Sequence, residues 1–162
     1  MLYAIIAAVA IVLDQLFKHW IVTNVSYGTD RALLPGIVHL TNVKNTGAAF
    51  SLFSNSTILL TVVTIIFILC LIAYLIFAKL DVRCRVCLSA VIGGALGNLA
   101  DRLRLGYVID MFEVEFVHYA IFNIADCFIV VGVILFCLFY IFSELKSEKA
   151  LKSKSGEKTD GD

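Results

Sequence analysis

Four long apolar segments constrain the fold of this chain more than any other feature of its sequence. They cover residues 2–21, 58–78, 86–103 and 124–142. Each is close to the roughly 20 residues that a helix needs to cross a bilayer. Because a backbone inside lipid must satisfy its own hydrogen bonds, these segments are expected to be helices. The mean hydropathy of +0.94 agrees, and the sequence therefore predicts an all-α membrane protein with four transmembrane helices.

The positions of lysine and arginine predict how the spans are oriented. Lys79, Arg83 and Arg85 lie in the short connection after the second span, and the tail after the fourth span is rich in lysine. Basic connections stay in the cytoplasm. Both chain ends are therefore expected to be cytoplasmic, with the other two connections outside. We expect residues 1–145 to form the membrane domain and residues 146–162 to form a polar cytoplasmic tail that is frayed or disordered.

The two outer connections carry strand patterns. Residues 36–43 are rich in β-branched side chains, and residues 107–117 partly alternate between apolar and polar. Both patterns are typical of strands. We expect a small sheet at the outer membrane surface.

Charge and cysteine content exclude several kinds of partner. The formal net charge is zero, so nothing favours binding to nucleic acid. Cys84 and Cys87 form a C-x-x-C pattern, but no second pair of ligands follows at zinc spacing. The five cysteines are interpreted as small thiols that fill apolar surroundings. We therefore expect no metal and no other cofactor.

Several polar residues lie in or beside the predicted spans, where a charge costs a few kcal/mol and needs a reason. They gather toward the outer half of the bundle and are Asp14, Lys18, Asn98, Asp101, Arg102, Asp110 and Asp126. Asp14 and Lys18 are one helical turn apart, with the acid first, which is the favourable order for an ion pair. The pair is either a structural contact near the interface, with Lys18 reaching outward, or an anchor for substrate and loops.

The third span combines glycine with polar side chains. Gly93 and Gly97 form a G-x-x-x-G pattern, which lets another helix approach closely. This pattern is often a dimer contact, but here we favour packing within the bundle. Asn98 and Arg102 share one helix face, which Asp101 borders. The three are either a structural polar patch or part of a functional site.

Asp110 and Asp126 carry the proposed chemistry. Asn123 followed by Asp126 matches helix-start chemistry, and Asp110 between apolar neighbours is expected to have a raised pKa. Two close carboxylates share one proton, so one can act as a base on water while the other donates a proton to the carbonyl or the leaving amine. Because a helix N-terminus favours an anion, we hypothesise that Asp126 is the ionised member and Asp110 the proton holder.

Five short motifs occur in order along the chain. They are Asp14-Gln15-x-x-Lys18, Asn45-Thr-Gly-Ala-Ala-Phe50, Gly94-Ala-Leu-Gly-Asn98-x-x-Asp101-Arg102, Val108-Ile-Asp110 and Phe122-Asn-Ile-Ala-Asp126. With these motifs, residues 12–130 closely resemble lipoprotein signal peptidase (signal peptidase II). One departure is Met111, where that family often has phenylalanine; the change conserves volume and apolar character.

The resemblance implies a membrane aspartyl endopeptidase of the bacterial cytoplasmic (inner) membrane. Such enzymes remove the signal peptide of prolipoproteins by cutting just before a diacylglyceryl-modified cysteine. The family's catalytic pair falls on Asp110 and Asp126. Its other motif positions, expected to bind substrate or support the pair, are Asn45, Asn98, Asp101, Arg102, Asn123, Asp14 and Lys18. The family fold adds a periplasmic β-cradle and a short periplasmic helix or loop to the four transmembrane helices.

The same resemblance implies the partners. These are diacylglyceryl-prolipoprotein substrates, membrane lipid and an inhibitor of the globomycin type at the active site, and a monomer suffices for one aspartate pair. We expect residues 106–122 to act as a lid over a site that opens sideways to lipid. The rival interpretations are a small transporter subunit with a proton relay and a structural dimerisation module. The inner halves of the spans carry almost no ionisable groups, which argues against a relay.

Overall fold

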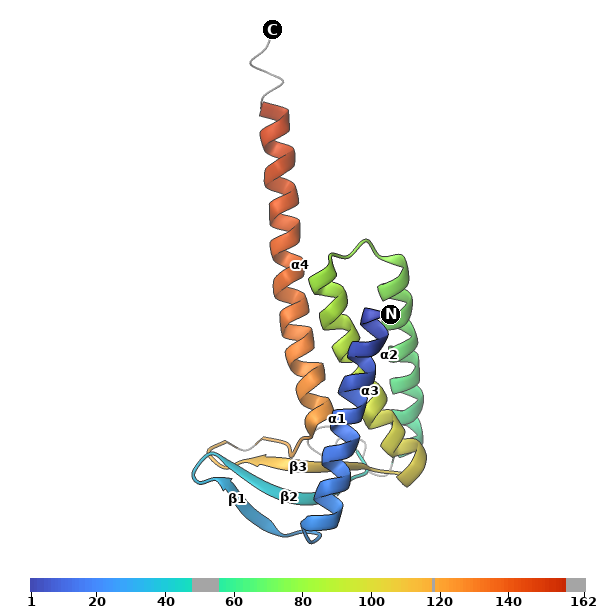
Figure 1. Ribbon diagram of the computed structural model, residues 1–162, viewed down its shortest axis with the longest axis vertical. Helices are drawn as coiled ribbons and strands as arrows, with labels where there is room; N and C mark the ends of the chain where they lie inside the picture. Colours follow the sequence, from blue (N-terminus) through green and yellow to red (C-terminus); the bar gives the residue numbers. More distant parts are fainter. Residues whose placement is uncertain (48–55, 118, 157–162) are drawn as a thin grey trace.

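A computed structural model of the chain describes residues 1–47, 56–117 and 119–156, with residues 147–156 described as backbone only. It contains four long helices and a three-stranded sheet that lies at one end of the helices (Figure 1). The helices are α1 (Leu2–Asn24), α2 (Thr57–Phe77), α3 (Val82–Leu105) and α4 (Ile124–Gly156). Each has a stretch long and apolar enough to cross a membrane, which confirms the predicted spans.

Helix α3 is the centre of the bundle because its glycines let its neighbours approach. A Cβ atom placed on Gly93 would lie 2.6 Å from the carbonyl oxygen of Ala7 in α1. A Cβ atom on Gly94 would lie 2.5 Å from the carbonyl oxygen of Ala125 in α4. No real Cβ fits at such distances, so α1 and α4 pack directly on the backbone of α3. The G-x-x-x-G pattern therefore serves packing within the bundle.

The sheet has the antiparallel order β1 (Asp30–Leu34), β2 (Val38–Asn45) and β3 (Val108–Val114). Strand β3 lies within the segment predicted at residues 107–117, and β2 overlaps the one predicted at residues 36–43 and continues two residues past it. Strand β1 was not predicted, because its five residues are all exposed and show no alternation. It forms by pairing with β2 across a turn in which Gly36 has a φ of +78°.

An apolar cluster joins the sheet to the end of α1. It consists of Ile21, Val25, Leu40, Ile109 and Met111. Met111 is fully buried there, so this apolar side chain fills the position where the resembling family often has phenylalanine. The cluster fixes the face of β3 against the bundle, and thereby the height of Asp110.

One expectation about the end of an element needs correction. Helix α4 continues to Gly156, past residue 145, where we expected a frayed or disordered tail to begin. The added residues are mostly lysine, glutamate, alanine, leucine and serine; the first four are strong helix formers, and extending an existing helix is easier than starting one. The resemblance implied a short periplasmic helix or loop. The described parts of the two outer connections form strands and loops, and residues 48–55 of the first connection lie outside the described residues.

Candidate active site

The two candidate catalytic aspartates lie on the wall of one cavity. Asp110 is in β3 and is 3% exposed, and Asp126 is in the first turn of α4. The cavity has a volume of about 190 Å³ and lies where the sheet meets the helices. Its other polar side chains are Asn45, Asn98, Arg102, Tyr119 and Asn123. Folding thus brings together two acids that are far apart in sequence, as expected.

Two amides hold Asp110 in place. Asn45 donates its Nδ2 hydrogen to Asp110 Oδ2 at 2.8 Å, and Asn123 donates from Nδ2 to Oδ1 at 2.7 Å. Gly47 donates its backbone N–H to Asn45 Oδ1, which orients that amide. Burial raises the pKa of Asp110 to about 6, against the hydrogen bond from Asn45, which lowers it. The expected raised pKa of Asp110 is therefore confirmed.

Asp126 caps its own helix and faces the cavity at the same time. Its Oδ2 accepts the backbone N–H of Asn123 at 3.1 Å, and Asn123 Oδ1 accepts the backbone N–H of Asp126 at 3.0 Å. This is the reciprocal arrangement of a capping box. The other carboxylate oxygen, Oδ1, accepts a hydrogen bond of 2.8 Å from Asn98 Nδ2. Asn123 therefore touches both acids, since it caps one and donates to the other.

Lys18 is buried within the bundle and does not reach outward to the interface. Its Nζ lies 2.8 Å from Asp14 Oδ2 and 2.9 Å from Asp101 Oδ2, and donates to Asn98 Oδ1 at 2.9 Å. With all three donors used, the ammonium is satisfied at 1% exposure. The contact also fixes the amide of Asn98, so that its Nδ2 side faces Asp126. The Asp14–Lys18 pair is thus a structural contact, and it supports the cavity as well.

The two acids paired with Lys18 hold the backbone beside the cavity. Asp14 Oδ1 accepts the backbone N–H of Ala125 at 2.9 Å, and Asp101 Oδ2 accepts that of Ile109 at 3.2 Å. Ala125 and Ile109 each directly precede one of the cavity aspartates. A buried carboxylate in α1 therefore sets the start of α4, and one in α3 sets the register of β3.

Gln15 is a residue to which the sequence analysis gave no role. It donates from Nε2 to Asp101 Oδ1 at 2.9 Å and to the carbonyl of Gly97 at 3.2 Å. Its position directly after Asp14 in the first motif was the available signal. Gln15 therefore donates hydrogen bonds to acceptors of the buried charge cluster, which consists of Asp14, Lys18 and Asp101.

Arg102 and the second connection complete the cavity. Arg102 lines it and donates from its NH2 group to the carbonyl of Gly47 at 3.3 Å, which ties α3 to the end of β2. Residues 119–122 form part of the wall. Phe112 stacks on Phe17 of α1 and contacts Phe122, with ring centres 5.6 Å apart in both cases. The expected lid segment therefore lies against the cavity, although Tyr107 points elsewhere.

The residues present favour acid–base chemistry. Among the described residues there is no group of three or more histidine, cysteine or acidic side chains placed to hold a metal ion. Cys84 and Cys87 are buried at the opposite end of α3 from the cavity. What the cavity offers is two carboxylates, three amides and one guanidinium, which can bind a peptide backbone and move protons at it.

Comparison with known proteins gives consistent matches over most of the chain. A family model described as signal peptidase (SPase) II matches residues 6–142. The chain is 42% identical over 156 residues to a lipoprotein signal peptidase of Enterococcus faecalis, covering 95% of this chain and 94% of that protein. It is 39% identical over 147 residues to one of Clostridioides difficile, covering 91% and 99%. A solved structure described as a bacterial membrane enzyme superposes with a TM-score of 0.80 at 30% identity, covering 90% and 88%.

Proposed function

Because this chain belongs to the signal peptidase II family, we propose that Asp110 and Asp126 are its two catalytic residues. Members of this family are membrane aspartyl endopeptidases, and this chain removes the signal peptide from bacterial prolipoproteins. The rival interpretations, a transporter subunit and a dimerisation module, are not supported. What remains is to assign the chemistry to residues.

One observation carries the assignment. Within the described part of the chain, the three buried aspartates and Asp126 of the cavity fall into two kinds. Asp14 and Asp101 are ion-paired with Lys18, whereas Asp110 and Asp126 have no cation within ion-pairing distance and accept only from amides and backbone. An acid that is held by neutral donors beside a cavity can exchange a proton with a bound molecule, while an acid whose oxygens are used by a buried lysine holds the structure. The two acids of the cavity are therefore the ones suited to catalysis.

The mechanism follows from the geometry of the pair. Each carboxylate oxygen has two acceptor positions and uses one of them on its amide or backbone donor, so the other can face the cavity. Asp126, at a helix N-terminus, is the base that takes a proton from a water molecule as its oxygen attacks the scissile carbonyl carbon. Asp110 gives its proton to the carbonyl oxygen. When the tetrahedral intermediate collapses, the C–N bond breaks and Asp126 passes the proton from water to the leaving amine. Asp110 takes a proton back from the hydroxyl that becomes the carbonyl oxygen of the product acid.

The remaining cavity residues position the substrate and the pair. Asn45 and Arg102 lie at the edge where an extended peptide would enter, and both offer donors for peptide carbonyls. Asn98 and Asn123 hold the two carboxylates, while Asp14, Lys18 and Asp101 hold those amides and the backbone beside them. The substrate is a diacylglyceryl-prolipoprotein, cleaved just before its modified cysteine, with its acyl chains in the surrounding lipid. A globomycin-type inhibitor would occupy the same cavity.

The deciding experiment uses the purified protein in detergent with a diacylglyceryl-modified prolipoprotein. Asp110→Asn and Asp126→Asn should each abolish cleavage while the protein stays folded. Glu113→Gln, which removes a carboxylate from the same strand as Asp110, should cleave like the wild type. Cleavage should survive chelators and thiol reagents. Wild-type turnover in either aspartate variant would refute the assignment.

The placement in the membrane is a further part of this proposal. The connection between α2 and α3 lies at the end of the bundle away from the sheet (Figure 1). Lys79, Arg83 and Arg85 lie in or directly after this connection, which supports cytoplasmic termini and a cavity on the outer side. A reporter that is active only in the cytoplasm should be active when fused after Gly156 and inactive when inserted in the turn between β1 and β2. The reverse pattern would invert the proposed orientation.

A further inference from the structure

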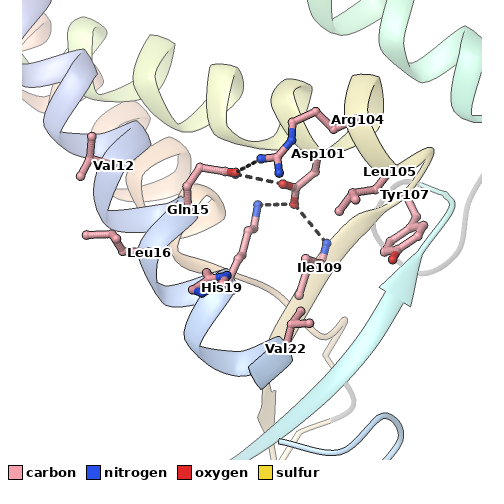
Figure 2. Close-up of a pocket in the computed structure, with 11 residues that line it drawn as sticks. Val12, Gln15, Leu16, His19, Val22, Asp101, Arg104, Leu105, Tyr107 and Ile109 are labelled. Atoms are coloured by element: carbon pink, nitrogen blue, oxygen red, sulfur yellow. Dashed lines mark hydrogen bonds and ion pairs between the residues drawn. The ribbon is translucent and has the colours of Figure 1, made fainter. Parts of the chain in front are cut away.

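A second pocket lies on the opposite side of the buried charge cluster from the aspartate pair. It has a volume of about 430 Å³ and is formed by α1, the last turn of α3 and the start of β3 (Figure 2). Of its lining residues, Gln15, Lys18, Asp101 and the backbone of Ile109 belong to the support of the catalytic pair, and Lys18 and Asp101 are buried. Nothing in the proposed cleavage reaction uses this pocket.

One part of the pocket is an apolar track along α1. Val12, Leu16 and Val22 line it and are all exposed, and Leu105 and Ile109 face them from α3 and β3. Residues 12 to 22 of a helix extend over about 15 Å, so the track is about as long as the hydrocarbon of one leaflet, which is half of a core about 30 Å thick. A surface of this kind in a membrane span is covered by hydrocarbon chains.

The other part of the pocket is cationic. Arg104 is exposed, and its one hydrogen bond within the described chain runs from NH1 to Gln15 Oε1 at 3.3 Å (Figure 2). The side chain of His19 is also exposed and lines the same pocket. The remaining donors of Arg104 are therefore available to an anion, with the side chain of His19 in the same pocket.

The acid in this pocket does not cancel the positive charge. Asp101 is 2% exposed, and its oxygens accept from Lys18, Gln15 and the backbone N–H of Ile109. Its oxygens are thus already used by donors inside the bundle, and among the described residues no ion pair joins it to Arg104. An arginine in the last turn of a helix also stabilises the helix dipole, but this leaves most of the guanidinium donors unused.

We propose that this pocket binds an anionic glycerophospholipid, with Arg104 donating to the phosphate and one acyl chain lying along the apolar track of α1. A guanidinium binds phosphate through charge-assisted hydrogen bonds, and a side chain at the membrane interface meets the phosphate at headgroup depth. The ligand is distinct from the substrate, because a diacylglyceryl-modified cysteine carries no phosphate. The site therefore does not depend on the assignment of the catalytic pair.

The test measures lipid binding and does not require turnover. The purified full-length chain in detergent is titrated with phosphatidylglycerol or phosphatidylcholine of identical acyl chains, and bound lipid is counted by native mass spectrometry. We expect preferential retention of phosphatidylglycerol, and about fivefold weaker retention in Arg104→Gln. Arg31→Gln removes an exposed arginine from β1 on the same end of the molecule and should retain the lipid like the wild type.

Three outcomes would overturn the proposal. Equal retention of both lipids by the wild type would show that the headgroup charge is not recognised. Equal losses in Arg104→Gln and Arg31→Gln would show attraction to general surface charge without a site. Displacement of the lipid by inorganic phosphate at equal concentration would show that the apolar track contributes nothing, and that the ligand is a free anion.

Discussion

Among the described residues, three aspartates are buried and a fourth, Asp126, is half-buried, and their hydrogen-bond partners divide them into two roles. Asp14 and Asp101 share the ammonium of Lys18, whereas Asp110 and Asp126 face a cavity with amide donors. Residue type is the same in both groups, and Asp110 is as buried as Asp14 and Asp101. The presence or absence of a buried cation separates an acid that holds the structure from one that can exchange a proton.

This division predicts opposite effects for one substitution. Asp14→Asn leaves Lys18 paired with Asp101 alone and weakens the buried hydrogen bonds that Asp14 accepts from Lys18 and from the backbone of Ala125, which should lower the free energy of unfolding by about 1–3 kcal/mol. Asp110→Asn removes a carboxyl group that burial already biases toward its neutral form, so the unfolding midpoint should stay near that of the wild type. Thermal unfolding in detergent measures both. If Asp110→Asn were the more destabilising of the two, the structural and catalytic roles would be wrongly divided.

The raised pKa of Asp110 predicts the alkaline limb of the activity profile. If Asp110 must carry the proton, kcat/KM should fall as the pH rises through about 6, because the acid form is then lost. Asn45→Ala removes a hydrogen bond that lowers this pKa, so the limb should move to higher pH whatever the loss in overall rate. A pH–rate series on both proteins checks the direction. A limb that moves to lower pH would contradict the proton-holding role.

At the scale of elements, the close contacts of α3 make its glycines sensitive. Gly93→Ala would place a methyl group 2.6 Å from the carbonyl of Ala7 and force α1 away. We expect a loss of about 1–3 kcal/mol from overpacking. Ala73→Val, which adds methyl groups to an exposed position on α2, is the matched control and should be neutral. Equal unfolding midpoints for the two variants would mean that α1 and α3 do not pack as described.

The sheet carries a contact that depends on pH. His39 on β2 lies 2.6 Å through Nδ1 from Asp30 on β1, and 3.0 Å through Nε2 from Glu115 after β3. The hydrogen bond with Asp30 raises the pKa of His39. Because the pKa of His39 is raised in the folded protein, the stabilisation that its contacts with Asp30 and Glu115 give the sheet is complete below about pH 6.5. This stabilisation is lost as the pH rises through the pKa of His39 in the folded protein.

Hydrogen exchange measures this effect. Amides of β1 should exchange faster, relative to intrinsic rates, as the pH rises through the pKa of His39. In His39→Gln this additional pH dependence should disappear. Persistence of the dependence in the variant would assign it to another group.

At the scale of the whole molecule, one chain supplies every contact of the aspartate pair that the described residues show. The sheet, α1, α3 and α4 each contribute to the cavity or its support. The close approaches at Gly93 and Gly94 are made to α1 and α4 of the same chain. We therefore expect a functional monomer. Light scattering with detergent correction should give the mass of one chain, about 17.9 kDa for the protein part, at concentrations where cleavage is measured. Activity that appears only at the mass of a dimer would contradict this.

The sequence by itself determined the features that are local along the chain. The spans follow from hydropathy, the capping chemistry of Asn123 and Asp126 from their spacing, and the close approach at Gly93 from the absence of a side chain. The five motifs, taken together, also identified the family. Each of these signals is contained within one helix or one connection, so that no knowledge of distant contacts was needed.

Only the tertiary structure decided which polar groups meet. It buried Lys18 between Asp14 and Asp101, paired β1 with β2 although the sequence of β1 is uninformative, and left the cavity aspartates without an ion pair among the described residues. Asp14 and Ala125, which share a hydrogen bond, are separated by 111 positions. Partners at such separations are set by how helices and strands pack. From its sequence position alone, each aspartate is equally compatible with a helix cap, an ion pair or a catalytic acid.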